Sequence, residues 1–244
     1  MQKIVLLFFF LISGWFWNAA AFAGDAEKPL ILLDPGHNPP KGGAISIRGT
    51  YEFEYNDRFA AMLMQALQKA AFQVELTRQP AQSISLQERV ALTNRLKPAL
   101  FLSLHHDSAQ PDYLDRFSGN GITAWRTKKK IAGYSIFVSQ ENALFGQSWL
   151  FAQQLGKFLS ELGRAFSLHH AEPIPGENRV LLDEKLGIYR FDELAVLRKA
   201  EVPAVLLEVG VIVDPDDEAY VSDQKNQERM VHAIVNAISM TLRK

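Results

Sequence analysis

Histidine and carboxylate side chains follow three of the short apolar segments of this sequence. His37 comes after the segment at residues 30–33, His105 after the segment at residues 99–104, and Glu208 after the segment at residues 204–207. If these segments are strands of an open α/β sheet, ligands bind outside their carboxyl ends. The sequence therefore predicts that two imidazoles and a carboxylate lie along one edge of a sheet.

Two imidazoles and a carboxylate are typical of a catalytic zinc site, which keeps one position open for water. Glu52 and Glu54 are the nearest further carboxylates by chain reach, and on a helix they lie about 200° apart. Glu52 shares its helical face with Asn56 and Phe59, the side expected to pack toward the sheet. We therefore expect Glu52 to be the third ligand, and Glu208 to stand beside the metal as a general base.

The elements that would position these residues alternate between short strands and longer helices. This order predicts a single α/β domain with a twisted, mostly parallel sheet and helices on both faces. Residues 107–133 are expected to form a long irregular loop over the catalytic edge. Apolar periodicity predicts strands at residues 30–33, 72–77, 99–104, 134–138 and 204–207, and helices at residues 55–71, 86–96, 148–162 and 224–242.

The first residues have the pattern of an export signal. Lys3 precedes an apolar run at residues 4–16, and residues 21–23 (AFA) form a small-x-small cleavage site. We expect a signal peptide at residues 1–23, cleaved near Ala23, and a catalytic domain at residues 24–244. The alternative, an uncleaved anchor, is disfavoured because the apolar run is short for a bilayer span. A periplasmic or secreted protein without integral membrane association follows.

Composition excludes several other chemistries. The chain has no cysteine, which rules out thiolate catalysis and thiolate metal ligands. Its formal net charge is −1, and the basic cluster of Arg126 with residues 128–130 is too small to indicate nucleic acid as a partner.

Six segments in the same order resemble the zinc-dependent N-acetylmuramoyl-L-alanine amidases of the type 3 family, and together they cover nearly the whole chain after residue 23. The resemblance implies Zn²⁺ as cofactor, with His37, Glu52 and His105 as ligands and Glu208 as the catalytic glutamate. It also implies peptidoglycan as partner, cut at the amide bond between the N-acetylmuramoyl lactyl group and L-alanine. The segments are residues 31–37 (ILLDPGH), 49–52 (GTYE) with Asn56 and Ala60, 74–78 (VELTR), 86–89 (LQER), 101–105 (FLSLH) and 203–210 (PAVLLEVG).

The chain departs from the family pattern at positions that are not ligands. His106 and Asp107 stand where a small residue and an asparagine are common, and Asp214 stands where asparagine often follows the last strand. His106 and His170 are further candidates for contacts with substrate.

Two rival functions are also compatible with the sequence. A zinc peptidase or carboxypeptidase acting on cell-wall peptides would use the same ligand set, and a non-catalytic cell-wall-binding protein would keep the fold. No activator protein is identified. Asp34 is expected either to brace its turn or to orient His37, and Arg78 and Arg89 to form ion pairs of the scaffold. His232 is expected to be a surface or satisfied core residue and not a ligand.

Overall fold

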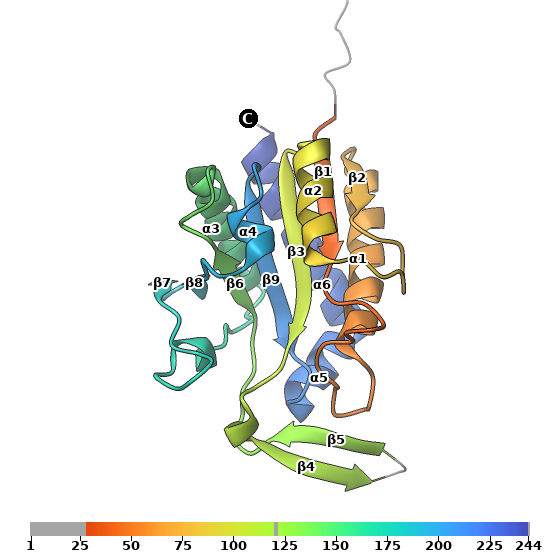
Figure 1. The fold of residues 1–244 in the computed structure, drawn as a ribbon, viewed down its shortest axis with the longest axis vertical. Coiled ribbons are helices and arrows are strands. Elements are labelled where there is room, and N and C mark those ends of the chain that lie inside the picture. The colour runs from red at the N-terminus through yellow and green to blue at the C-terminus, as the bar shows by residue number, and fades with distance from the viewer. Residues whose placement is uncertain (1–27, 120–121, 244) are drawn as a thin grey trace, which may run out of the picture.

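A mixed sheet forms the centre of the protein (Figure 1). The computed structural model describes residues 28–119 and 122–243, so the predicted signal peptide lies outside the described residues. Within the described ranges, no helix is both long and apolar enough to span a bilayer. In spatial order the strands are β2 (Gln73–Leu76), β1 (Leu30–Pro35), β3 (Leu100–Asp107), β9 (Ala204–Val211), β6 (Ser135–Val138), β8 (Ile188–Arg190) and β7 (Leu181–Asp183).

The mostly parallel arrangement expected from the sequence is confirmed. Strand β1 pairs in parallel with β2 and β3, and β3 pairs in parallel with β9. Strand β6 runs antiparallel to β9, while β8 is parallel to β6 and β7 is antiparallel to β8. The carboxyl ends of β1, β3 and β9 consequently meet at one edge of the sheet.

Helices cover both faces of the sheet, as predicted. Helices α1 (Glu52–Lys69), α3 (Phe145–Glu161) and α6 (Gln224–Leu242) lie on one face, whereas α2 (Leu86–Leu96) and α4 (Ala195–Arg198) lie on the other (Figure 1). The bounds of α2 and α6 match those predicted. Helix α1 begins three residues earlier than expected, where the Glu54 carboxylate accepts a hydrogen bond from the backbone N–H of Tyr51 at 3.2 Å. The remaining helical elements are α5 (Pro215–Ser222) and two short 3₁₀ turns, η1 (Pro111–Tyr113) and η2 (His169–Ala171).

Alternation along the strands decides on which face each functional side chain lies. Phe101 and Leu206 belong to the smaller core beneath α2 and α4. Residues on one strand that differ by an even number share a face, so His105 and Glu208 project to this side. His106 projects to the opposite side, toward α1.

Residues 107–133 are more ordered than the sequence indicated. They contain an antiparallel hairpin of β4 (Leu114–Gly119) and β5 (Ile122–Thr127), which extends from the carboxyl edge of the sheet (Figure 1). The expectation of an irregular loop was therefore wrong. Asp214 stabilises the base of the hairpin. Its Oδ2 accepts hydrogen bonds from the Thr127 hydroxyl at 2.7 Å and from the Ile131 N–H at 3.0 Å.

Candidate metal centre

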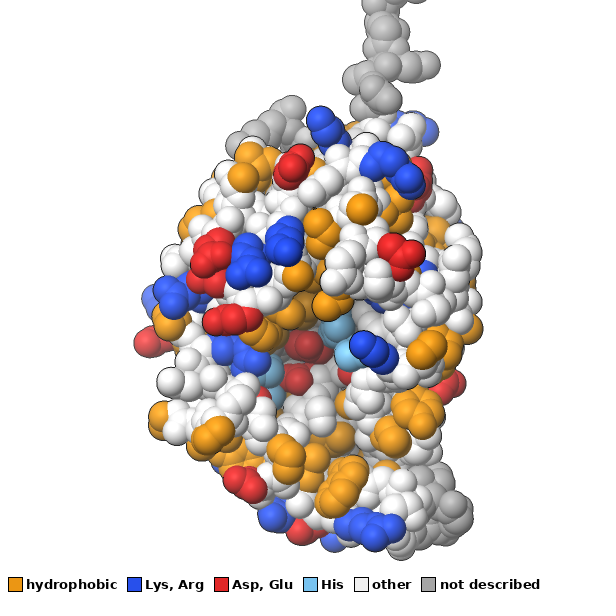
Figure 2. Space-filling view, in the orientation of Figure 1, with side chains coloured by type: hydrophobic (Ala, Val, Ile, Leu, Met, Phe, Trp, Pro, Cys, Tyr) orange, Lys and Arg blue, Asp and Glu red, His pale blue; other side chains and the backbone are white. Residues whose placement is uncertain are grey.

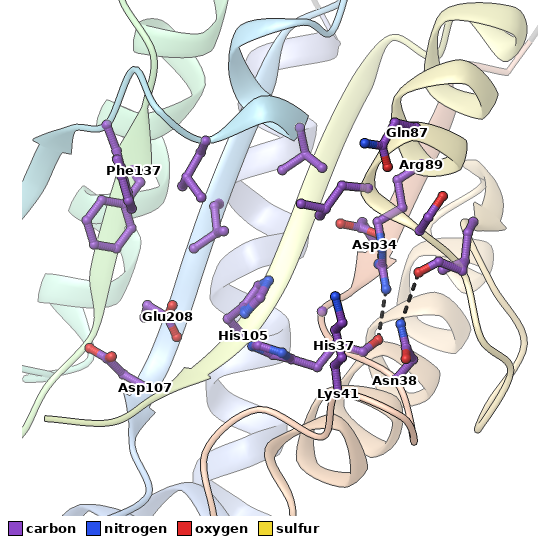
Figure 3. A pocket seen from close by; sticks show the side chains of 18 of the residues that line it. Asp34, His37, Asn38, Lys41, Gln87, Arg89, His105, Asp107, Phe137 and Glu208 are labelled. Atoms are coloured by element: carbon purple, nitrogen blue, oxygen red, sulfur yellow. Dashed lines mark hydrogen bonds and ion pairs between the residues drawn. The ribbon is translucent and has the colours of Figure 1, made fainter. Parts of the chain in front are cut away.

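A cleft of about 830 Å³ opens at the carboxyl ends of β1, β3 and β9. Figure 2 shows it as a hollow in which histidine and acidic side chains gather. His37, His105, Glu208 and Asp107 line this cleft (Figure 3), as does His170. The fold thus brings to one place the residues that follow three separate apolar segments of the sequence.

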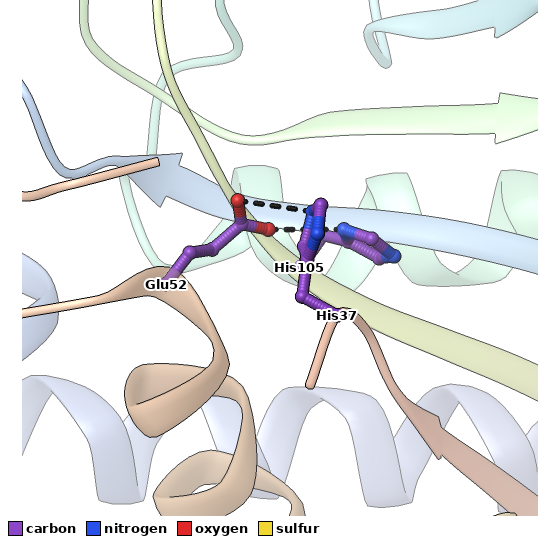
Figure 4. Close-up of side chains that lie close together, drawn as sticks. All are labelled: His37, Glu52 and His105. Carbon is purple, nitrogen blue, oxygen red and sulfur yellow. Dashed lines mark hydrogen bonds and ion pairs between the residues drawn. The ribbon is translucent and has the colours of Figure 1, made fainter. Parts of the chain in front are cut away.

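His37, Glu52 and His105 form a compact cluster (Figure 4), and its two histidines line this cleft. Nε2 of His37 lies 3.2 Å from Oε2 of Glu52, and Nδ1 of His105 lies 3.0 Å from Oε1 of the same carboxylate. One potential ligand atom from each residue lies within 4.8 Å of the others. The side chains of His37 and His105 are 34% and 18% exposed, whereas that of Glu52 is 6% exposed, so the cluster opens toward the cleft.

Two glycines permit the close approach of these side chains. A Cβ atom at Gly36 would overlap the His105 ring, and one at Gly43 would overlap the Glu52 carboxylate. Gly43 also has a positive φ of 76°, which favours glycine. His37 itself has a φ of 57°, a left-handed conformation that is uncommon for a residue with a side chain.

Two buried arginines hold the turn that carries His37. Arg78 Nε donates to the carbonyl oxygen of His37 at 2.9 Å, and Arg89 Nη2 donates to the same oxygen at 2.8 Å. Arg78 also pairs with Asp57 at 2.6 Å, and Arg89 pairs with Asp34. Both arginines therefore belong to ion pairs, and both also fix the backbone beneath His37.

Asp34 braces the strand end. Its carboxylate accepts hydrogen bonds from the hydroxyl of Thr77 at 2.6 Å and the hydroxyl of Ser103 at 2.8 Å, in addition to its pairing with Arg89. These partners belong to the scaffold and none is an imidazole, which favours the bracing role among the two expected for this residue.

Electrostatics keep Glu52 ionised. Burial raises the pKa of this carboxyl, but hydrogen bonds from His105 and His37 and the charges of both rings outweigh it and hold the pKa well below its usual range. The backbone N–H of Ala44 adds a hydrogen bond to Oε2 at 3.0 Å. A carboxylate held in this state is what a metal ligand has to be.

The pKa of Glu208 is shifted in the opposite direction from that of Glu52. It pairs in register with His105 across β3 and β9. Its Oε2 is buried and has no hydrogen-bond partner among the described residues. Burial, followed by the charges of Asp107 and Glu52, raises its pKa well above the ordinary value. This carboxylate therefore has the higher proton affinity that proton transfer requires.

The two histidines predicted to contact substrate have different positions. His106 is 1% exposed, and its Nδ1 lies 2.7 Å from Oδ1 of Asn56 on α1. Because it faces away from the cleft, we correct the expectation of a substrate contact there. Burial lowers the pKa of His106 to about 3, so the ring is neutral. His170 does line the cleft.

The sequence did not reveal the partners of His170. Its Nε2 lies 2.8 Å from Oδ2 of Asp107, and its Nδ1 lies 2.9 Å from Oε2 of Glu177. Burial lowers the pKa of His170, but the charges and hydrogen bonds of the two carboxylates raise it to about 9. Glu172, the carboxylate nearest in sequence, instead pairs with Lys129 at 3.2 Å. The adjacent pair of histidines was the signal in the sequence, but its carboxylate partners follow only from the fold.

The fold and the cluster together define a class: an α/β domain with a candidate metal centre at the carboxyl edge of its sheet. Comparison with known proteins specifies it further. The family model for N-acetylmuramoyl-L-alanine amidase matches residues 31–240, and the chain belongs to this family.

Curated relatives agree with this assignment, and a solved structure shares the fold. The chain is 28% identical over 235 residues to a probable cell wall amidase LytH of Staphylococcus epidermidis, an alignment that covers 93% of this chain and 65% of the relative. The LytH of Staphylococcus aureus is 27% identical over 237 residues, covering 94% and 66%. The chain thus spans slightly less than two thirds of these relatives. An N-acetylmuramoyl-L-alanine amidase from Clostridium difficile 630 has a similar fold, with a TM-score of 0.69, 22% identity and coverage of 90% of this chain and 99% of that one.

Proposed function

We propose that this protein is a zinc-dependent N-acetylmuramoyl-L-alanine amidase that hydrolyses the bond between the lactyl group of N-acetylmuramic acid and L-alanine in peptidoglycan. The observation that carries the proposal is the meeting of His37, Glu52 and His105 beside a cleft that both histidines line together with Glu208. Membership of the amidase family and the similarity to relatives named as cell wall amidases support the choice of substrate.

The residues of the cluster fit zinc. Two imidazoles and one carboxylate are a common set of three protein ligands for catalytic zinc. The carboxylate is ionised, and the cluster is open on the side of the cleft. Zinc held there would polarise a carbonyl group and lower the pKa of bound water to about 7.

Glu208 would provide the proton transfer. A buried carboxylate oxygen without a partner among the described residues is free to accept a proton from the attacking water. The same carboxyl then gives that proton to the departing nitrogen of L-alanine, so that the carboxylate is restored. Arg89 and Arg78 would keep His37 in place through the turn that they hold.

The proposed substrate lies outside the cytoplasmic membrane. We therefore propose that the protein acts in the periplasm or outside the cell, in agreement with the export signal predicted at residues 1–23.

Product analysis tests the proposal. The purified protein is incubated with peptidoglycan and with soluble muropeptides, and the products are identified by mass spectrometry and by labelling of new amino termini. We expect free muramic lactyl groups and new L-alanine amino termini, which the variant Glu208→Gln should produce at least about 100-fold more slowly. Release of D-alanine would instead identify a carboxypeptidase, and binding without cleavage would identify a cell-wall-binding protein.

A further inference from the structure

A second cluster of potential ligands borders the same cleft, which two of its three members line. Oδ2 of Asp107 lies 3.2 Å from Nε2 of His169 and 2.8 Å from Nε2 of His170. One potential ligand atom from each of the three residues lies within 4.8 Å of the others. These separations resemble those of 3.0 and 3.2 Å within the cluster of His37, Glu52 and His105.

The fold builds this cluster from distant parts of the chain. Asp107 is the last residue of β3, and the two histidines belong to η2, with His170 lying 63 positions further along the chain. His169 and His170 are only 3% and 6% exposed. Burial of polar groups is costly unless each finds a partner, and Asp107 is the carboxylate that both rings approach.

Nδ1 of each ring already has a hydrogen-bond partner. Nδ1 of His169 lies 2.7 Å from the hydroxyl oxygen of Ser167, and Nδ1 of His170 lies 2.9 Å from Oε2 of Glu177. Histidines that bind metals typically engage their other ring nitrogen in this way, which fixes the tautomer and the direction of the ring. Both Nε2 atoms are thereby left to point toward Asp107.

The clearest evidence for a bound cation comes from His169. Its Nε2 is buried and makes no hydrogen bond with any residue that the structure describes, although the Asp107 carboxylate is near. Buried polar atoms without a hydrogen-bond partner are rare in folded proteins. A cation between Asp107 and the two rings would satisfy this nitrogen.

We propose that Asp107, His169 and His170 form a second metal site, distinct from that of His37, Glu52 and His105. Two imidazoles with one carboxylate favour a transition-metal dication such as Zn²⁺ over Mg²⁺ or Ca²⁺, which prefer oxygen ligands. Asp107 and His170 line the cleft with Glu208. In Figure 3, Asp107 lies on the side of Glu208 away from His37 and His105. The second metal would thus face the candidate general base from the other side.

Metal stoichiometry tests this proposal independently of any activity. The protein is stripped with a chelator and titrated with Zn²⁺ by calorimetry, and bound metal is measured by mass spectrometry after dialysis. We expect two equivalents in the parent protein and one in each of His169→Gln and Asp107→Asn. His37→Gln should also retain one equivalent, and His37→Gln combined with His169→Gln should retain none. His232→Gln, which changes an exposed histidine on α6, is the control and should retain two.

The outcomes separate the two sites. A parent protein that binds one equivalent, lost in His37→Gln, would overturn the second site and keep the first. Two equivalents that persist in both His169→Gln and Asp107→Asn would also overturn it, because the metal would then lie elsewhere. Titration with Co²⁺, followed by its visible absorption, should show two successive components, of which His169→Gln loses one. Circular dichroism verifies that each variant is folded, and the stoichiometry of the parent protein decides even if a variant is not.

Discussion

Arg89 donates a hydrogen bond to the carbonyl oxygen of His37 at 2.8 Å. The same guanidinium donates to the carbonyl oxygen of Pro35 at 2.8 Å and pairs with the buried Asp34. Because His37 adopts a left-handed backbone conformation, its neighbours have to hold it there. Arg89 therefore positions the His37 ring through the backbone that carries it, without contacting the ring.

Replacement of Arg89 by methionine should both destabilise the fold and weaken the metal site. It leaves the Asp34 carboxylate buried without its ion-pair partner, which typically costs about 3–5 kcal/mol. Urea unfolding of the metal-free protein measures this loss, and calorimetry measures zinc affinity. Arg95→Met, on the exposed side of the same helix, is the control and should stay within about 0.5 kcal/mol of the parent protein. Equal stability of the two variants would show that Arg89 has no bracing role.

The two glutamates of the proposed site should respond differently to replacement by glutamine. Glu208→Gln removes the proton acceptor but no proposed ligand, so turnover should fall by about 100-fold to 10,000-fold while zinc remains bound. Glu52→Gln removes the proposed ligand charge and should lower zinc content itself. Metal content and rate are measured on both variants. A zinc-depleted Glu208 variant beside a slow but zinc-replete Glu52 variant would reverse the two roles.

Gly36→Ala should displace the His105 ring, because a Cβ atom there would overlap it. We expect lower zinc affinity and lower turnover in a protein that still folds. Gly146→Ala is the matched control, since a Cβ atom at that position of α3 meets nothing within 4 Å among the described residues. Calorimetric zinc titration of both variants decides the matter. If both kept the affinity of the parent protein, the close approach of Gly36 to His105 would not matter.

The hairpin of β4 and β5 should act on substrate and not on the metal. Trp125 is 48% exposed, and Arg126 beside it is also exposed, so both are available to a glycan or a peptide carboxylate. Replacement of residues 114–127 by a short turn should raise the KM for intact peptidoglycan and leave zinc content unchanged. Steady-state kinetics on peptidoglycan and on small muropeptides measure the effect. Unchanged kinetics with both substrates would make the hairpin a simple connection.

Much of the fold could be predicted from the sequence because periodicity is a local property. Helices α2 and α6 have the predicted bounds, and His37, Glu52 and His105 do lie together. Periodicity does not encode the direction of a strand, so the antiparallel pairing of β6 with β9 could not be predicted. Strands β7 and β8 span only three residues each, too few for a pattern to stand out.

The second cluster could not be predicted for a different reason. Asp107 and His170 are 63 positions apart, and only the sheet and the turn of η2 bring them within hydrogen-bonding distance. His106 shows the converse case. It follows His105 directly, but because successive side chains of a strand point to opposite faces, its side chain lies in the interior.

The place of β9 in the sheet has a consequence for how the protein is made. This strand comes last in the sequence, yet it lies between β3 and β6, which are not paired with each other. As the chain folds, β3 and β6 each keep an unpaired backbone edge until residues 204–211 pair with them, and such edges are prone to aggregation. Glu208 belongs to β9, the strand that joins β3 to β6. The folding chain therefore acquires its proposed general base only when the two parts of the sheet are joined.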